Sequence, residues 1–353
     1  MGAAMKSIRC LAAIAAVLVL LAVFTTSVSA KEDPLAKWKP DFDPSGAAFT
    51  YVLSCVGHPA IEGVTVGYRI RDRVWKESNG QLYVDFRPLS QLGGEKDVIN
   101  KLKFGAIHGM LSSSVAAANI APLLGVVNLP FLIDDFDKLD RFRDSQELWE
   151  PFKNAAMSNG LRVVDFTGYG SYGWATTTPV NTLADAKTVN FRIAQAPVNI
   201  DAYKAWKLKF SVLPWPDVPQ ALQTGVINGL DHTPIVCNIS RKFTVAKYYT
   251  EINYAQGLYI HIMNEQWLKK LPETLQQTFL NVIREESSAA RKLTQKQQIE
   301  QIAAAKADGV TFLTLDENDR KTMVSASESL YESWGEKIGK AYLDKVRAAF
   351  PQN

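Results

Sequence analysis

Two patterns of apolar residues alternate along this chain, one typical of strands and one typical of helices. In residues 81–87 apolar and polar positions alternate, which is typical of a half-buried strand, whereas residues 61–77 carry apolar side chains at close to helical spacing. The same patterns predict further strands at 49–56, 106–112, 161–166, 188–193, 210–213, 254–263 and 310–315. They predict further helices after Gly93-Gly94 and at 199–207, 272–307 and 316–350, the last with a break. Strands that alternate with helices indicate an α/β fold with parallel sheets.

The first thirty residues follow a different pattern. Lys6 and Arg9 precede an unbroken apolar run at 10–24, and Val28-Ser29-Ala30 supplies small residues at a cleavage position. This predicts a secretory signal peptide at 1–30. The alternative is an uncleaved anchor, for which the run is short because a span needs about 20 residues. Residues 31–47 are polar and proline-rich and are interpreted as an N-terminal arm.

Size, charge and cysteine content narrow the class of protein. The remaining chain of about 320 residues suggests one large domain or two smaller ones. Lys and Arg number 39 against 36 Asp and Glu, with no basic block, so the sequence does not favour a nucleic-acid partner. Cys55 and Cys237 could form a disulfide or be two buried thiols. Two thiols are favoured because a chain this long does not need a disulfide for stability.

The segment 190–234 contains the clearest candidate chemistry. Arg192 lies in an apolar strand-like run, where a charge is costly unless an anion meets it. A guanidinium can hold a carboxylate through two parallel hydrogen bonds. Trp215 lies between two prolines that fix the local backbone, although core packing is an alternative role for it. Asp231 and His232 directly follow the turn signal Asn-Gly.

Other motifs argue against catalysis and cofactors. Residues 168–173 fit G-x-G-x-x-G, but the β-branched residues and Pro179 that follow make a poor helix, so nucleotide binding is disfavoured. We interpret this run as a loop whose backbone approaches something small. No two histidines have metal-ligand spacing. His58 and His232 could line a cleft, whereas His108 and His261 are expected to be surface or core histidines without a functional role. With no nucleophile elbow or P-loop, we expect neither a metal nor a cofactor.

Six stretches in this order resemble the solute-binding proteins of TRAP (tripartite ATP-independent periplasmic) transporters, C4-dicarboxylate-binding type. They are 79–84 (Asn-Gly-Gln-Leu-Tyr-Val), 90–95 (Ser-Gln-Leu-Gly-Gly-Glu), 129–132 (Leu-Pro-Phe-Leu), 191–194 (Phe-Arg-Ile-Ala), 221–229 (Ala-Leu-Gln-Thr-Gly-Val-Ile-Asn-Gly) and 267–272 (Trp-Leu-Lys-Lys-Leu-Pro). The resemblance implies a two-lobed periplasmic-binding-protein fold with a hinge and a ligand cleft between the lobes. It also implies a periplasmic receptor, expected to be a monomer, that captures a small carboxylate and delivers it to TRAP membrane permease subunits.

The resemblance also implies roles for single residues. The family's carboxylate-binding arginine falls on Arg192, its stacking aromatic on Trp215 and its acidic–amide pair on Asp231 and His232. A second family arginine is replaced in the loop that holds Tyr172 and Trp174. Further candidate ligand contacts are Ser113, His58 and Glu95, with Ser113 and Ser114 at a position where acid-sugar binders carry glutamate. These departures disfavour sialic acid and dicarboxylates, and they favour a monocarboxylate with hydroxyl, keto or aromatic character.

The predicted organisation has lobe I at 48–167 plus 257–303 and lobe II at 168–256 plus 304–353. The crossovers near Gly168 and Gly257 would form the hinge. Two other functions remain open at this point. One is a secreted enzyme that acts on a carboxylate substrate with His58 or His232 as base, and the other is a scaffold or sensor-partner domain without a ligand.

Overall fold

The computed structural model describes Asp33 and residues 35–351, so the predicted signal peptide lies outside the described residues. The chain comprises two compact units, Met1–Phe42 and Asp43–Asn353. In the first unit a short 3-10 helix, η1, spans Ala36–Trp38, and Lys39 forms an exposed ion pair with Asp33 at 3.2 Å. The remaining elements belong to the second unit.

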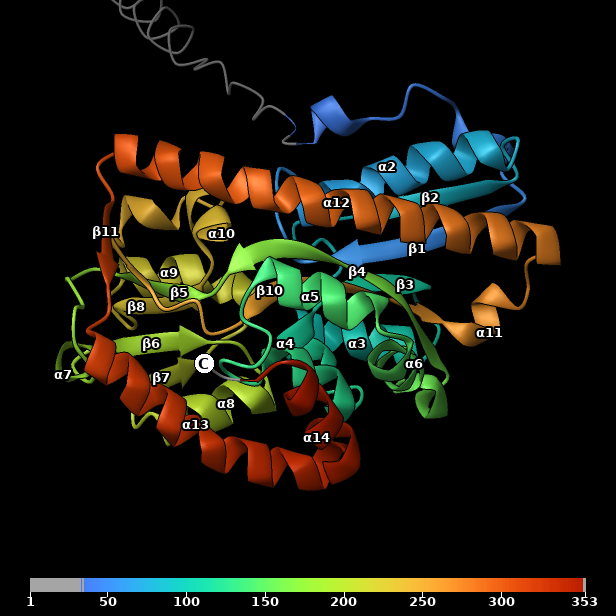
Figure 1. Cartoon of the computed structure of the whole chain (residues 1–353). Helices are drawn as coiled ribbons and strands as arrows, with labels where there is room; N and C mark the ends of the chain where they lie inside the picture. The colour runs from blue at the N-terminus through green and yellow to red at the C-terminus, as the bar shows by residue number, and fades with distance from the viewer. Residues whose placement is uncertain (1–32, 34, 352–353) are drawn as a thin grey trace, which may run out of the picture. The chain divides into compact units, whose positions relative to one another are not determined.

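A five-stranded mixed sheet forms one half of the second unit (Figure 1). Its strand order is β2 (Leu82–Arg87), β1 (Phe49–Cys55), β3 (Gly109–Ser113), β10 (Gln256–Asn264) and β4 (Leu161–Ser171). The strand β1 is parallel to β2 and β3, as predicted. The strand β10 is antiparallel to both neighbours, so the expected parallel sheet is in fact mixed. No helix separates β10 from β9 of the other sheet.

A six-stranded sheet forms the other half. Its order is β11 (Thr311–Thr314), β9 (Tyr248–Glu251), β5 (Gly173–Thr176), β8 (Gly229–His232), β6 (Asn190–Ile193) and β7 (Lys209–Val212). The strand β5 is antiparallel to β8 and β9, whereas β6 is parallel to β7 and β8.

The glycine-rich run at 168–173 is extended, so its interpretation as a loop is wrong. It belongs to the end of β4 and the start of β5, and only Tyr172 separates the two strands. Gly170 has φ of 103°, which favours glycine. The predicted close backbone approach does occur, but to protein atoms: a Cβ added at Gly173 would lie 2.5 Å from the carbonyl oxygen of Thr250.

Helices cover both sheets. They are α2 (Glu62–Glu77), α3 (Glu95–Lys103), α4 (Ser114–Ala117), α5 (Phe136–Asp144), α6 (Gln146–Asn154), α7 (Leu183–Ala186), α8 (Pro197–Ala205), α9 (Val218–Gln223), α10 (Pro234–Ile239), α11 (Glu265–Leu268), α12 (Glu273–Ala307), α13 (Glu317–Ile338) and α14 (Lys340–Ala349). Asp135 caps α5. The predicted break near the C-terminus lies at Gly339, where φ is 94°.

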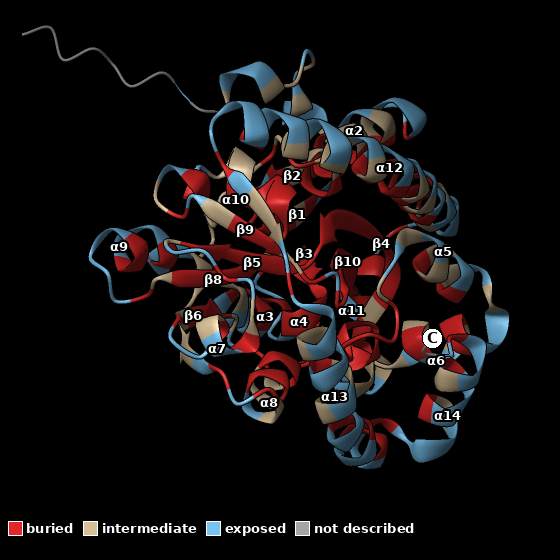
Figure 2. Cartoon of the chain, turned by 60° about the vertical axis from the view of Figure 1, so that its left-hand side comes forward, coloured by how far each residue is buried: buried red, intermediate tan, exposed pale blue. Residues whose placement is uncertain are grey.

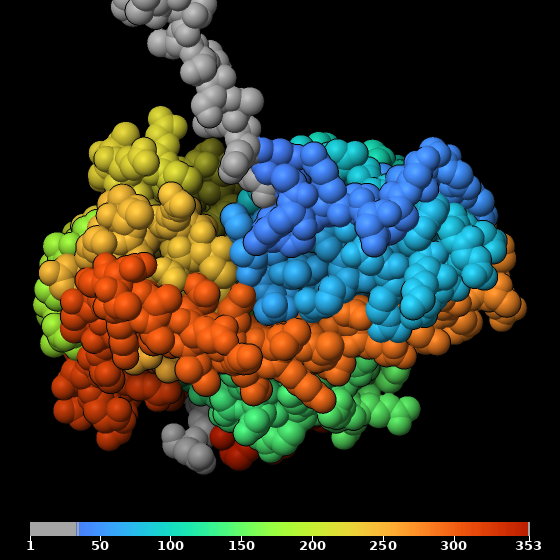
Figure 3. Space-filling view, turned by 90° about the horizontal axis from the view of Figure 1, so that it is seen from above, coloured from blue at the N-terminus to red at the C-terminus, as the bar shows by residue number. Residues whose placement is uncertain are grey.

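The 35-residue helix α12 connects the two halves. It packs on α2 and β4 of the first half and on α10 of the second, and its orange surface runs along one face of the molecule (Figure 3). Its sequence contains neither glycine nor proline and is rich in Gln, Glu, Lys and Ala, which favour an uninterrupted helix.

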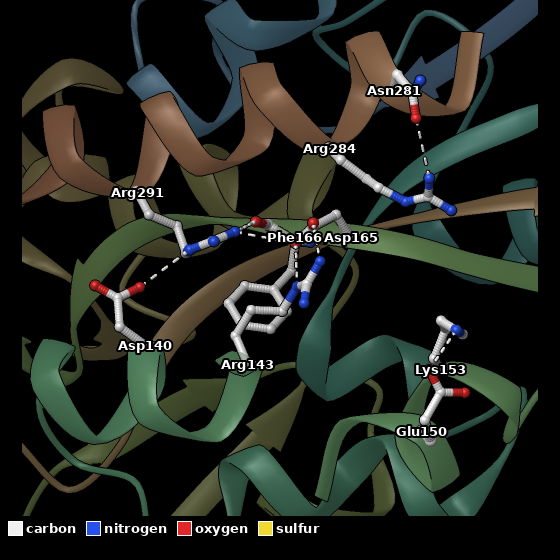
Figure 4. Close-up of polar contacts among 9 residues, drawn as sticks. All are labelled: Asp140, Arg143, Glu150, Lys153, Asp165, Phe166, Asn281, Arg284 and Arg291. Carbon is white, nitrogen blue, oxygen red and sulfur yellow. Dashed lines mark hydrogen bonds and ion pairs between the residues drawn. The ribbon is translucent and has the colours of Figure 1, made fainter. Parts of the chain in front are cut away.

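A cluster of charged residues fixes α5 and α12 to β4 (Figure 4). Asp165 of β4 is buried and accepts two hydrogen bonds from Arg143, at 3.0 and 2.7 Å. Arg291 of α12 donates to the same carboxylate at 3.0 Å, to the carbonyl oxygen of Phe166 at 2.8 Å and to Asp140 at 3.1 Å. Every charge in this cluster therefore meets a charge of opposite sign at hydrogen-bond distance.

Most strand residues are buried, except in the edge strands β7 and β11, and the outer faces of the helices are exposed (Figure 2). Every residue of β10 is buried, because the strand lies between β3 and β4 and helices cover the sheet. Cys55 and Cys237 are free and buried, as favoured from the sequence. Within the described residues, no helix is both long and apolar enough to cross a membrane.

Candidate ligand-binding site

One cavity, with an empty volume of about 550 Å³, brings together all predicted site residues except Trp174. The residues that line it are Val56, Gly57, His58, Ile61, Glu95, Ser113, Val115, Tyr169, Tyr172, Arg192, Ala194, Asn199, Trp215, Asp231, His232, Val236, Ser240 and Tyr259. Many of them lie at or just after the carboxyl ends of β1, β3, β6, β7 and β8. In open α/β sheets this edge is where ligands bind.

Arg192 is the central charge of the cavity. It lies in β6 and is only 5% exposed. Its Nε donates to the carbonyl oxygen of Leu213 at 3.0 Å. Glu95 and Asp231 attract the guanidinium, yet neither forms a hydrogen bond or an ion pair with it. Burial lowers the pKa of Arg192 from its usual value. The two terminal nitrogens thus belong to a buried cation that has no ion-pair partner among the described residues.

Trp215 and His232 form one wall next to this arginine. The Trp215 ring centroid lies 5.5 Å from the guanidinium carbon and 4.9 Å from the imidazole centroid of His232. Burial, with Arg192 and Lys242 nearby, holds the pKa of His232 well below its usual value, so the imidazole is neutral. Its Nδ1 accepts from the backbone N–H of Thr233 at 3.0 Å. The proton therefore lies on Nε2, which can donate one hydrogen bond.

Asp231 is held from two sides. The Tyr254 hydroxyl donates to its two oxygens at 2.8 and 3.1 Å, and Asn199 Nδ2 donates to one of them at 2.9 Å. The carboxyl is 3% exposed, and this burial raises its pKa to about 7. Tyr254 and Asn199 were not predicted as site residues, because each lies far from Asp231 in the sequence.

Glu95 and Ser113 form a second polar pair. Glu95 is the first residue of α3, and Ser113 ends β3 and caps α4. The carboxylate accepts from the Ser113 backbone N–H at 2.6 Å and from its hydroxyl at 2.8 Å. Burial raises the pKa of Glu95. The resemblance indicated both residues, and the fold now explains their contact, since α3 precedes β3 and packs on it.

Tyrosines complete the cavity. Tyr169, Tyr172 and Tyr259 line it together, and the hydroxyls of Tyr169 and Tyr172 lie 2.7 Å apart. The rings of Tyr169 and Tyr259 have centroids 4.5 Å apart. Only Tyr172 was predicted. His58 also lines the cavity, and its Nδ1 accepts from the backbone N–H of Ala60 at 3.1 Å.

Trp174 does not belong to this group, and its predicted ligand contact is wrong. It is fully buried in β5, a strand inside the second sheet, and its ring packs 5.1 Å from that of Phe191. The indole is thus covered by the core of its own sheet. His108 and His261 also lie away from the cavity. Among the described residues, no cluster of His, Cys, Asp and Glu has the arrangement of a metal site.

The sequence as a whole matches a known family. The family model described as "DctP: Bacterial extracellular solute-binding protein, family 7" matches residues 65–337. The chain belongs to this family. A relative in Escherichia coli, the 2,3-diketo-L-gulonate-binding periplasmic protein YiaO, is 26% identical over 262 residues, which are 73% of this chain and 78% of the relative. The C4-dicarboxylate-binding periplasmic protein DctP of Vibrio cholerae is 25% identical over 308 residues, 85% and 90% of the two chains.

Solved structures agree with the family assignment. A TRAP periplasmic solute-binding protein from Sulfurospirillum deleyianum with bound succinate has a TM-score of 0.78 and 26% identity, over 86% of this chain and 99% of that one. The two sheets with their helices are therefore the two lobes of a TRAP solute-binding protein, as predicted. Members of this family are periplasmic solute receptors that work with a membrane permease, so the enzyme alternative is not supported.

Proposed function

We propose that this protein captures a small monocarboxylate in the cavity around Arg192 and delivers it to the membrane subunits of a TRAP transporter. The observation that carries the proposal is the buried guanidinium of Arg192 without an ion-pair partner among the described residues. A buried charge is costly unless it is paired. A carboxylate ligand that accepts from both terminal nitrogens would supply the missing partner.

The remaining cavity residues support a single carboxylate in the ligand rather than two. Among the described residues, Arg192 is the one arginine that lines the cavity, and no lysine lines it. Nε2–H of His232 can donate a hydrogen bond to a hydroxyl or keto oxygen of the ligand. Trp215 and Tyr172 offer ring surface for the ligand body. These side chains favour a hydroxy, keto or aromatic acid over a dicarboxylate.

The lobe boundaries near Gly168 and Gly257 remain part of this proposal. Gly168 lies in β4 and Gly257 in β10, and these two strand segments are paired with each other. Tyr172 directly follows the last residue of β4. Rotation at these connections would open and close the cavity, which residues of both sheets line. We also propose that residues 1–30 are removed on export and that the receptor is a monomer.

The test is the variant Arg192→Ala. A thermal-shift screen of hydroxy, keto and aromatic monocarboxylates identifies a ligand, since binding to the native state raises stability by mass action. Calorimetry with that ligand should then show that Arg192→Ala loses about 2–5 kcal/mol of binding free energy, because a desolvated anion is left unpaired. For most ligands this abolishes measurable binding, while the protein stays folded.

The control is Arg284→Ala, which removes an arginine of α12 whose partner is Asn281, outside the cavity. Its affinity should equal that of the unmodified protein. Unchanged affinity in Arg192→Ala would refute the assignment. Recovery of the ligand after denaturation separates a receptor from an enzyme, since a receptor returns its ligand unaltered.

A further inference from the structure

The Glu95 carboxylate is placed in the cavity as a hydrogen-bond acceptor. The Ser113 hydroxyl accepts the backbone N–H of Ala116 at 3.3 Å, so its proton is directed to Glu95. The Ser113 backbone N–H can only donate, and it donates to the other carboxylate oxygen. Glu95 is also at the N-terminus of α3, where the helix dipole favours a negative charge. These contacts suit the ionised form of Glu95.

No cation in the part of the chain that the structure describes forms an ion pair with this carboxylate. Arg192 attracts Glu95 without forming an ion pair, and we assign its terminal nitrogens to the carboxylate of the ligand. Lys242 donates to the carbonyl oxygen of Ser240, stacks 4.9 Å from the Trp215 ring centroid and does not line the cavity. A ligand with a carboxylate alone would therefore add a second anion near Glu95 and leave the glutamate unpaired.

Asp231 is less accessible than Glu95. It is 3% exposed, and its oxygens receive hydrogen bonds from the side chains of Tyr254 and Asn199. Glu95 is only partly buried and accepts from the backbone N–H and the hydroxyl of Ser113. Because a carboxylate offers about four acceptor positions, Glu95 keeps capacity for a donor from the ligand.

The rings that share the cavity with Glu95 also suit a positive charge. Tyr169, Tyr172 and Tyr259 all line the cavity and all interact electrostatically with Glu95. The faces of aromatic rings attract cations, and the attraction is greater in desolvated sites. Aromatic rings next to a partly buried carboxylate form the kind of surroundings that suit an ammonium or amidinium group.

We propose that the ligand is a zwitterion, whose carboxylate pairs with Arg192 and whose cationic nitrogen pairs with Glu95 among the tyrosine rings. This inference rests on the proposed function, because it needs an organic acid at Arg192. It narrows the ligand class from monocarboxylates in general to those that carry a protonated nitrogen.

Matched sets of ligands test it by calorimetry. In each set the shape is nearly constant and the charge changes: proline against cyclopentanecarboxylate, piperidine-2-carboxylate against cyclohexanecarboxylate, and 4-aminobutanoate against pentanoate and 4-hydroxybutanoate. In at least one set the zwitterion should bind about tenfold or more tightly than its counterparts without the protonated nitrogen, which corresponds to about 1.4 kcal/mol.

The variant Glu95→Gln should remove that preference while the carbocyclic acids keep or gain affinity. Asp97→Asn is the matched control, since Asp97 lies on the same helix but does not line the cavity, and it should keep the preference. A preference that survives in Glu95→Gln would overturn the role of Glu95. The inference would be overturned if, in each set, the carbocyclic, aliphatic or hydroxyl member without nitrogen bound as tightly as the zwitterion. It would also be overturned if no zwitterion bound.

Failure of this inference is distinguishable from failure of the proposed function. If acids without a protonated nitrogen bind best and lose affinity in Arg192→Ala, the receptor assignment stands and only the zwitterion is excluded. If a bound acid keeps its affinity in Arg192→Ala, the proposed function itself fails.

Discussion

Two buried arginines of this molecule have opposite surroundings. Arg291 is 8% exposed and Arg192 is 5% exposed, so both guanidiniums have left bulk water. Arg291 donates to Asp140, Asp165 and a backbone carbonyl, as Figure 4 shows. Arg192 donates from Nε to the carbonyl of Leu213 and forms no ion pair with the described carboxylates. The degree of burial therefore does not distinguish the roles of the two arginines, whereas their hydrogen-bond and ion-pair partners do.

The difference separates a structural charge from a functional one. In the Arg291 cluster the attraction between neighbours compensates for desolvation. In the cavity the compensation is incomplete, and a ligand can complete it. The comparison predicts that substitutions in the two regions affect different quantities, namely folding stability in one and ligand affinity in the other.

Asp165→Ala should have the largest effect on folding. It would leave the buried guanidinium of Arg291 and the partly buried one of Arg143 without their shared carboxylate, and removal of one partner of a buried ion pair costs about 3–5 kcal/mol. Urea denaturation followed by circular dichroism measures this loss. Lys153→Ala, which breaks an exposed pair with Glu150, is the control and should cost less than about 1 kcal/mol. Equal losses in the two variants would contradict the structural role of the cluster.

The paired variants Arg291→Met and Arg192→Met compare the two arginines directly. Arg291→Met should lower the free energy of unfolding by about 2 kcal/mol, because it removes charge-assisted hydrogen bonds while Arg143 still neutralises Asp165. Arg192→Met should change it by less than about 1 kcal/mol without ligand, since a poorly compensated buried charge is removed. The same denaturation measurements apply. A larger loss in Arg192→Met than in Arg291→Met would overturn the comparison.

The pH dependence of stability concerns Asp231. Its pKa is raised to about 7 in the folded protein from 3.8, so the folded state binds the proton more tightly than the unfolded state. Its contribution to stability is therefore full below about pH 4 and is lost as the pH rises to about 7. The slope cannot exceed about 1.4 kcal/mol per pH unit. The difference in unfolding free energy between the unmodified protein and Asp231→Asn, measured from pH 4 to 8, should fall along this slope, and a constant difference would contradict it.

Much of the fold was predictable because hydrophobic periodicity reports local burial. The strands β1, β2 and β6 and the helix α12 follow their patterns closely. The direction of β10 was not predictable, since a fully buried strand has the same pattern in a parallel or an antiparallel sheet. The strand β5 begins in the glycine-rich run that was interpreted as a loop, and β8 and β9 were not predicted either.

The site was predictable where a residue type conflicts with its surroundings. Arg192 is a charge in an apolar strand, and Trp215 is fixed between prolines. Tyr169, Tyr259 and Asn199 show no such conflict, because each is an ordinary residue of a strand or a helix. Only the folded chain places them around the cavity. Trp174 was assigned by its proximity to Tyr172, and sequence distance does not decide which side of a sheet a ring occupies.

Tyr172 combines two positions that are usually distant from each other. It is the single residue between β4 of one sheet and β5 of the other, its backbone N–H donates to Ala255 and its carbonyl accepts from Asn253. Its ring also lines the cavity. In the proposed closure, a ligand that contacts this ring acts directly on the connection about which the lobes rotate. Occupancy could then set the angle between the lobes without any relay of intermediate residues, so that the permease would distinguish a loaded receptor from an empty one by its shape alone.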